Sequence, residues 1–151
     1  MRLVILGCGR SGSTLALMLA SAGHEVTLID RNPDTVRRRL GDKPNIKTVL
    51  GNGLDHDILQ KAKVEEADAF FALTRGDNTN LMAAQIVQRR YNVARVVAKV
   101  ADPMRADAYR KMGLYVVNAS ALIAGMSMDW LTGAESRPAE EYNILVKELE
   151  I

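Results

Sequence analysis

The sequence predicts an α/β fold in which helices cover both faces of a parallel sheet. Six short apolar segments of strand character alternate along the chain with segments whose apolar residues recur at helical spacing. Strands that alternate with helices form βαβ units, so neighbouring strands run parallel. A glycine-rich turn between the first strand and the first helix is the second indication, because it is typical of the doubly wound sheet with strand order 3-2-1-4-5-6.

The apolar runs place the strands, and the segments between them place the helices. The expected strands cover residues 3–6, 26–30, 46–50, 69–74, 94–100 and 115–118. The expected helices cover residues 13–22, 33–40, 55–63, 78–91, 103–113 and 121–131. The fourth strand is apolar almost throughout, as expected of a strand that is covered on both faces.

Residues with special backbone preferences mark the ends of these helices. Gly23 ends the first helix, and Gly41 ends the second, since glycine favours the position after a helix. Pro33 opens the second helix, where its missing N–H costs nothing. Asp102 caps the fifth helix, and Gly113 ends it.

The glycine-rich turn follows the pattern G-x-G-x-x-G between a strand and a helix, which makes the match specific. Gly7 permits a tight turn, Gly9 lets the backbone approach a pyrophosphate, and Gly12 lets the helix lie against the strand. The free N–H groups at the start of the helix then face the phosphates. The expected binding residues of this turn are Gly7, Cys8, Gly9, Arg10, Ser11 and Gly12.

An acidic residue ends the second strand, as expected for a site that binds a dinucleotide. Asp30 lies 18 residues after Gly12, near the spacing expected of the acid that binds the adenosine ribose. Its carboxylate accepts hydrogen bonds from ribose hydroxyls and repels a 2′-phosphate, which favours NAD over NADP, although Arg31 follows directly. The alternative is that Asp30 only caps the helix that begins near Asn32.

The predicted strand order places the ligand crevice at the carboxyl ends of strands one and four, where the order reverses. Besides the glycine-rich turn and Asp30, this arrangement brings two loops to the crevice. The first contains Gly51, Asn52 and Gly53, and the second runs from Thr74 to Asp77.

Bulk properties limit the other classes of function. The chain has 151 residues, enough for one domain, and its net charge of +2 gives no strong attraction to nucleic acid. Cys8 is the single cysteine, so no intramolecular disulfide is possible. We identify no signal peptide and no apolar run long enough to span a membrane.

The residue types needed for catalysis are not grouped in the sequence. His24 and His56 are the two histidines, and neither has a neighbouring histidine or cysteine that would complete a metal site. A dehydrogenase also needs a proton-transfer group beside the nicotinamide and room for a second substrate. We therefore expect no catalytic residue, no bound metal and no enzyme activity.

The chain changes character after the sixth strand. The apolar residues of 121–131 lie on most sides of the helix, which suggests that a second subunit covers it. Residues 133–138 have the composition of a linker, and residues 144–151 alternate as a strand does. This tail suggests either that a second domain has been cut away or that the tail pairs with a neighbouring subunit.

The sequence resembles the RCK domain, also called the KTN or TrkA N-terminal domain, from residue 1 to about residue 121. The resemblance rests on the glycine-rich turn with Arg10, on Asp30, on the loop 51–53 and on the spacing of Thr74, Asp77 and Asn80. It implies residues 1–120 as the nucleotide-binding domain, 121–133 as a helix that crosses to a partner subunit, and 134–151 as the start of a C-terminal region.

The resemblance also implies a function, as a regulatory subunit of a potassium transporter or channel. RCK domains bind NAD(H), ATP, ADP or AMP, and they assemble as dimers and octameric rings beneath an integral-membrane potassium-translocating subunit. We therefore expect NAD(H) as the first candidate ligand and a cytoplasmic location at the inner face of the membrane. The alternatives are the cofactor domain of an NAD-dependent dehydrogenase that lacks its substrate domain, and a scaffold with an inactive site.

Individual roles follow from the same resemblance. Arg10 would contact phosphate or a nucleotide of the neighbouring subunit, and Thr74 would line the floor of the crevice. Asn52 stands near the adenine, where the family usually has Asp. The remaining residues expected at the crevice are Arg31, Leu73, Asp77, Asn80 and Lys99.

Overall fold

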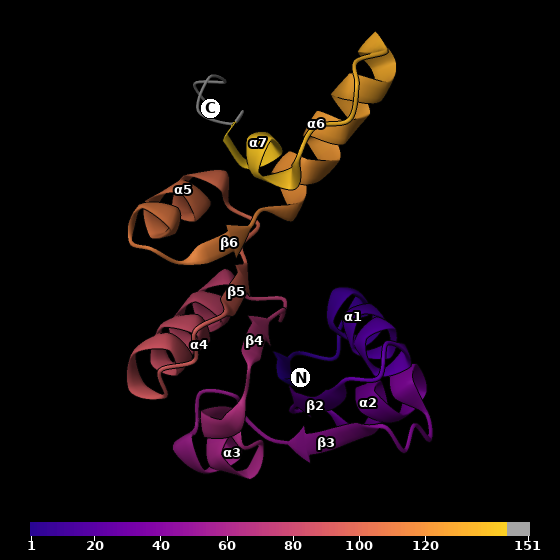
Figure 1. Cartoon of the computed structure of the whole chain (residues 1–151), viewed down its shortest axis with the longest axis vertical. Helices are drawn as coiled ribbons and strands as arrows, with labels where there is room; N and C mark the ends of the chain where they lie inside the picture. The colour runs from indigo at the N-terminus through magenta and orange to yellow at the C-terminus, as the bar shows by residue number, and fades with distance from the viewer. Residues whose placement is uncertain (145–151) are drawn as a thin grey trace.

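The computed structural model of the chain describes residues 1–144 and shows one six-stranded sheet (Figure 1). All neighbouring strands are parallel, and their order is β3-β2-β1-β4-β5-β6. The strands are β1 (Arg2–Leu6), β2 (Glu25–Asp30), β3 (Ile46–Leu50), β4 (Ala69–Ala72), β5 (Val96–Lys99) and β6 (Tyr115–Val117). Both the predicted fold class and the predicted strand order are confirmed.

Helices cover the two faces of the sheet. The helices are α1 (Arg10–Ser21), α2 (Pro33–Leu40), α3 (His56–Lys61), the 3-10 helix η1 (Val64–Glu66), α4 (Asp77–Arg90), α5 (Pro103–Lys111), α6 (Ala119–Thr132) and α7 (Ala139–Ile144). Buried residues of α1 and α2 pack on one face, whereas those of α3, α4 and α5 pack on the other (Figure 1).

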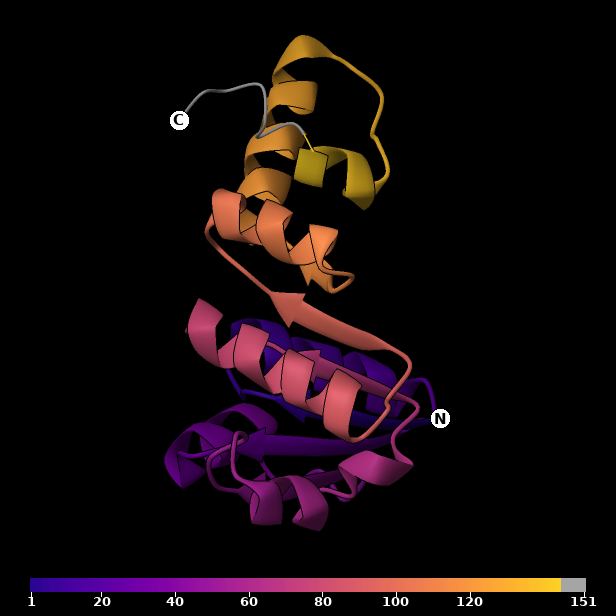
Figure 2. The same cartoon turned by 90° about the vertical axis from the view of Figure 1, so that its left-hand side faces the viewer.

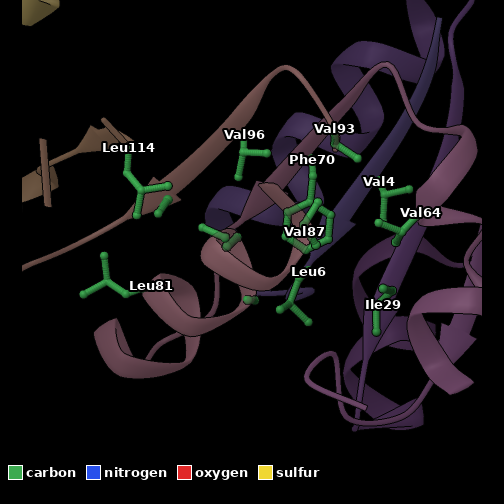
Figure 3. Close-up of a cluster of buried hydrophobic side chains, with 14 of the residues drawn as sticks. Val4, Leu6, Ile29, Val64, Phe70, Leu81, Val87, Val93, Val96 and Leu114 are labelled. Carbon is green, nitrogen blue, oxygen red and sulfur yellow. The ribbon is translucent and has the colours of Figure 1, made fainter. Parts of the chain in front are cut away.

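The central strand β1 explains why both faces are apolar. Because side chains alternate along a strand, Val4 and Leu6 pack on the side of α4 while Ile5 packs on the side of α1. Phe70 of β4 is 0% exposed and lies at the centre of the first of these clusters, close to Val87 of α4 (Figure 3). Burial on both sides holds β1 at the centre of the sheet, and the turn that follows β1 is fixed with it.

Several predicted boundaries differ from the structure, among them those of the strand expected over 94–100, which covers Val96–Lys99. Three other differences have local reasons. Helix α1 begins at Arg10 rather than at residue 13, because the turn itself forms the first helical turn and the Ser13 N–H donates to the Gly9 carbonyl. Strand β4 ends at Ala72 rather than at residue 74, since Thr74 bonds to a side chain of α4. The helix expected over 55–63 is shorter and is followed by η1.

Helix α6 extends away from the sheet, as Figures 1 and 2 show. It begins two residues earlier than predicted because Asn118 caps it, with its side chain accepting a hydrogen bond from the Ala121 N–H at 2.8 Å. Several large apolar side chains of this helix are exposed, and Trp130 is 85% exposed. The exposed apolar stripe of α6 consists of Ile123, Met126, Met128, Trp130 and Leu131.

Helix α7 packs against a different side of α6, at Gly125. Tyr142 lies against Gly125, where a Cβ would come within 2.4 Å of the tyrosine ring. The Arg137 guanidinium binds the Asp129 carboxylate and lies 5.2 Å from the centre of the Tyr142 ring. The Tyr115 hydroxyl donates to Glu140 at 2.9 Å and so ties α7 to β6.

Of the tail that was expected to alternate like a strand, Ile144 is the last residue of α7. The other residues, 145–151, lie outside the described residues. The pairing expected for this tail therefore stays a prediction.

We predict that acid releases α7 from α6. The hydrogen bond from Arg137 lowers the pKa of Asp129 below its ordinary value of 3.8. A carboxyl group with a lowered pKa stabilises the fold fully above its unfolded pKa, and this contribution is lost as the pH falls through the folded pKa. The amides of α7 should therefore show faster hydrogen exchange, relative to those of α4, as the pH falls below about 3.8.

The variant Asp129→Asn provides the control for this prediction. It should show at pH 7 the loosened α7 that the unmodified protein shows only in acid. Equal protection of α7 in both proteins at pH 7 would contradict the assigned role of the ion pair.

Candidate nucleotide-binding site

A cavity of about 210 Å³ lies at the carboxyl ends of the strands, where β1 and β4 adjoin. This is the topological switch point at which open α/β sheets bind ligands. Its lining residues are Leu6, Gly7, Asp30, Arg31, Gly51, Asn52, Gly53, Thr74 and Thr79. A larger hollow of about 340 Å³ lies at the opposite edge, where Arg2 pairs with Glu66, but the glycine-rich turn does not reach it.

Two glycines of the turn are required by the fold itself. Gly7 has φ +104°, and a Cβ there would lie 2.9 Å from the backbone nitrogen of Thr74. A Cβ on Gly12 would lie 1.9 Å from the carbonyl oxygen of Gly7, so only glycine lets α1 start this close to β1. By contrast, a Cβ on Gly9 would meet nothing within 4 Å. The space beside Gly9 is therefore open to a ligand.

Among the described residues, no side chain caps the backbone N–H groups at the start of α1. Gly9 is the N-cap residue, no side chain caps the helix, and its first turn contains no acidic residue. The N–H groups of the first turn, together with the positive end of the helix dipole, favour an anion. Arg10 and Ser11 lie on this turn and are exposed, so both accompany the N–H groups at the surface.

Asp30 ties the end of β2 to the glycine-rich turn. One carboxylate oxygen accepts the Cys8 N–H at 2.6 Å, and the other accepts the Asn32 N–H at 2.9 Å. The side chain that caps α2 is that of Asn32, which accepts the Thr35 N–H at 3.0 Å. Asp30 therefore does more than mark the start of a helix, because it lines the cavity next to the turn.

The side chain of Cys8 is buried in the apolar core and does not line the cavity. It is 0% exposed and packs with apolar residues under α1 and α2. Burial, and secondarily the charge of Asp30, raises the pKa of the Cys8 thiol, while Arg39 acts in the opposite direction. Cys8 thus contributes its backbone N–H to the site, and its thiol has little nucleophilic character.

The loop after β3 carries a hydrogen-bonded group at the rim of the cavity. The Asn52 side-chain oxygen accepts from the Arg31 guanidinium at 2.5 Å and from the Leu54 N–H at 3.3 Å. The Asn52 side-chain nitrogen donates to the Asp55 carboxylate at 3.0 Å. These contacts join the ends of β2 and β3 across the mouth of the cavity.

The Thr74, Asp77 and Asn80 side chains connect the ends of β4 and β5. Asn80 is 0% exposed; it accepts the Thr74 N–H and donates to the Lys99 carbonyl, both at 2.8 Å. Asp77 accepts the N–H groups of Ala101 and of the next residue at 3.0 Å. Among these three side chains, Thr74 is the one that lines the cavity.

The structure thus divides the predicted site residues into two groups. The residues that line the cavity are Gly7, Asp30, Arg31, Gly51, Asn52, Gly53 and Thr74. The other predicted residues do not line it: Cys8, Gly9, Arg10, Ser11, Gly12, Leu73, Asp77, Asn80 and Lys99. Leu6 and Thr79 line the cavity and were missed; the position of Thr79 in the first turn of α4, directly after β4, is the signal that points to it.

Other chemistry is not apparent in the described part of the chain. Within residues 1–144, no three His, Cys, Asp or Glu side chains are grouped so that they could hold a metal ion. The His56 Nδ1 lies 2.5 Å from the Tyr91 hydroxyl, on α3 and away from the lining of the cavity. No helix among the described residues has the length and apolar character needed to cross a bilayer.

Comparisons with known proteins agree with this architecture. The model of the TrkA-N domain family matches residues 3–120. The "Trk system potassium uptake protein TrkA" of Streptomyces coelicolor is 45% identical over 117 residues, which are 78% of this chain and 52% of that protein. The chain spans little more than half the length of this relative and of the TrkA homolog of Methanothermobacter thermautotrophicus, which is 36% identical.

Two solved structures show the same fold with ligands named in their descriptions. The Kef C-terminal domain of Shewanella denitrificans in its AMP-bound form has a TM-score of 0.73 and 21% identity, and covers 99% of this chain and 93% of that one. The GsuK channel bound to NAD has a TM-score of 0.65 and 24% identity, and covers 82% of this chain and 22% of that one.

We predict that two glycine substitutions in the turn affect different properties, one the stability of the fold and the other the binding of the ligand. Gly12→Ala places a Cβ against the backbone carbonyl of Gly7 and should lower the free energy of unfolding by about 1–3 kcal/mol. Gly9→Ala has open space and should change the stability by less than about 1 kcal/mol, yet its methyl group should obstruct the ligand. Denaturant unfolding and nucleotide titration of both variants test this. A stable Gly12→Ala protein, or a Gly9→Ala protein with undiminished affinity, would contradict the assignment.

Proposed function

The chain belongs to the TrkA-N domain family, and on that basis we propose that it is the nucleotide-sensing domain of a regulatory protein for potassium transport. The names of its curated relatives support the transport role. The observation that carries the sensing role is the cavity beside the glycine-rich turn, with Asp30 at its edge. A nucleotide bound there would report the state of the cell to a membrane partner.

The ligand that we propose is an adenosine nucleotide, with NAD(H) as the first candidate and AMP, ADP or ATP as alternatives. The phosphates would lie against Gly9 and the start of α1, where the N–H groups are open. The ribose hydroxyls would donate to the Asp30 carboxylate, and the base would extend toward Arg31. The AMP-bound Kef domain and the NAD-bound GsuK channel, which share the fold, support this class of ligand.

Hydrogen bonds, together with the first turn of α4, link the floor of the cavity to α6, and this link would give the sensor a route to other subunits. Thr74 is bonded to Asn80, and Asp77, three residues before Asn80 at the start of α4, accepts the Ala101 N–H at 3.0 Å. The Asn118 side chain donates to the Ala101 carbonyl at 3.4 Å and also caps α6. A ligand that prefers one arrangement of these groups would shift the orientation of α6.

We propose that the exposed apolar stripe of α6 binds the same stripe of a second copy. Trp130 and Met126 lie on this stripe, beside a shallow apolar depression. Large exposed apolar patches mark interaction sites. A contact of this kind closes at two subunits, so a ring would need a second interface between dimers. Such a ring would act on an integral-membrane potassium-translocating subunit from the cytoplasmic side.

We propose no catalytic activity for the domain. The lining of the cavity, as far as the chain is described, contains no histidine, lysine, tyrosine or cysteine side chain for proton transfer or nucleophilic attack. Asp30, the one acid in the lining, already accepts two backbone N–H groups. These features support binding rather than a hydride-transfer reaction.

The proposed ligand should stabilise the fold. At a concentration 100 times its Kd, a nucleotide adds about 2.7 kcal/mol to the stability, which raises the Tm by several degrees. Asp30→Asn weakens the ribose contacts and should lower the affinity about tenfold to a hundredfold. Asp34→Ala, at an exposed position on α2, is the matched control. If NAD, NADH, AMP, ADP and ATP all leave the Tm unchanged at millimolar concentration, the proposal is wrong.

The proposed dimer is tested by sedimentation. The unmodified protein should sediment as a dimer or a larger assembly, and Trp130→Glu should dissociate it because a charge would be buried in an apolar contact. Met104→Glu changes an exposed methionine on α5 and should leave the assembly intact. A monomer at all concentrations would rule out the role proposed for α6.

A further inference from the structure

We propose that Asn52 is a positioning residue that holds Arg31 across the mouth of the crevice and does not read the edge of the bound base. This inference rests on the proposed binding of a nucleotide. It concerns the residues on the adenine side of the cavity, where an amide would otherwise be expected to recognise the base.

The hydrogen bonds of Asn52 fix its orientation. The Arg31 guanidinium can only donate, so it must face the amide oxygen, and the Asp55 carboxylate accepts, so it must face the amide nitrogen. The amide oxygen also accepts the Leu54 N–H. Both lone pairs of this oxygen are therefore used. Adenine presents an amino group that needs an acceptor, and Asn52 has none to offer. The second N–H of the Asn52 amide can donate only to a ring nitrogen, so it cannot recognise the amino group.

The hydrogen bonding of Arg31 differs from that of an arginine in an ion pair. Its guanidinium is anchored by a neutral amide, 21 residues away in the sequence, rather than by a carboxylate. Of the residues that line the cavity, Arg31 is the single cation and Asp30 the single anion. A flat guanidinium in this place can lie against the face of a base, and this contact depends on the ring and not on its hydrogen-bonding edge.

The consequence is weak discrimination between bases that differ only at the edge. AMP and IMP share the ribose, the phosphate and the fused ring, but the 6-amino group of AMP is an oxygen in IMP. A site that stacks the ring without reading this edge should bind both with affinities within about threefold of each other. A site in which Asn52 reads adenine should favour AMP strongly.

Calorimetric titration of AMP and IMP against four proteins tests the proposal. Asn52→Ala should weaken both ligands equally, by about threefold to tenfold, because Arg31 loses its anchor. Arg31→Ala should weaken both ligands to a similar extent. In the double variant, Asn52→Ala should add nothing to the loss from Arg31→Ala, because the two residues act as one unit. A loss confined to AMP, or losses that add in the double variant, would overturn the proposal.

Three further variants provide a comparison, a rescue and a control. Asn52→Asp alone keeps an acceptor for Arg31 but places two carboxylates side by side. Combined with Asp55→Asn, it keeps this acceptor and again has an amide N–H that donates to a carboxylate between positions 52 and 55. The combined variant should recover the affinity for both ligands. Asn45→Ala, an exposed asparagine before the other end of β3, should bind as the unmodified protein does. If the unmodified protein binds neither AMP nor NAD, the proposed function itself fails, an outcome distinct from unequal losses in the variants.

Discussion

The carboxylate of Asp30 joins the two parts of the molecule on which the site depends. Parallel pairing of β1 with β2 brings Leu6 beside Ile29, and the Gly7 N–H continues this ladder by donating to the Ile29 carbonyl at 2.8 Å. One residue further on, Asp30 accepts the Cys8 N–H, so the turn is held by the strand next to it. The acid for which we propose ribose binding and the turn for which we propose phosphate binding are thereby held relative to each other without a ligand, which would lower the cost of ordering the site.

The contacts that shape the floor of the cavity also support the helix that leaves the domain. Asn80 holds the ends of β4 and β5 together through backbone groups, and these groups would be costly to leave unpaired in a buried place. The same edge of the sheet carries Ala101, which lies between Asp77 and Asn118. Any coupling between the cavity and α6 along these contacts would pass through Ala101, an exposed loop residue between β5 and α5. Coupling of this kind requires that the ligand prefer one of two arrangements.

The architecture could be predicted from the sequence because the signals that determine it are local. Apolar runs, helix-ending glycines and the turn 7–12 predicted the six strands, their order and the place of the crevice. Two errors in the predicted starts of helices also have local causes. Helix α1 begins inside the turn, and α6 begins at its asparagine cap, and neither start is marked by a change in apolar periodicity.

Other features were out of reach because they depend on partners distant in sequence. The pairing of Arg31 with Asn52 joins two exposed loops 21 residues apart. The spacing of Thr74, Asp77 and Asn80 predicted a place near the crevice, but two of these side chains are occupied by backbone groups at the end of β5. Spacing alone does not show which polar side chains face a ligand and which hold the strands that frame it.

The central claim is that an adenosine nucleotide binds at the glycine-rich turn beside Asp30. The most direct measurement is an NMR titration of the labelled protein with AMP and with NAD, following the backbone amides. If the nucleotide binds there, the largest shifts should occur at Cys8, whose N–H bonds to Asp30, at Gly9 and at the amides of the loop 51–53. Shifts centred instead on the hollow near Arg2 and Lys47, or no shifts at all, would contradict the account.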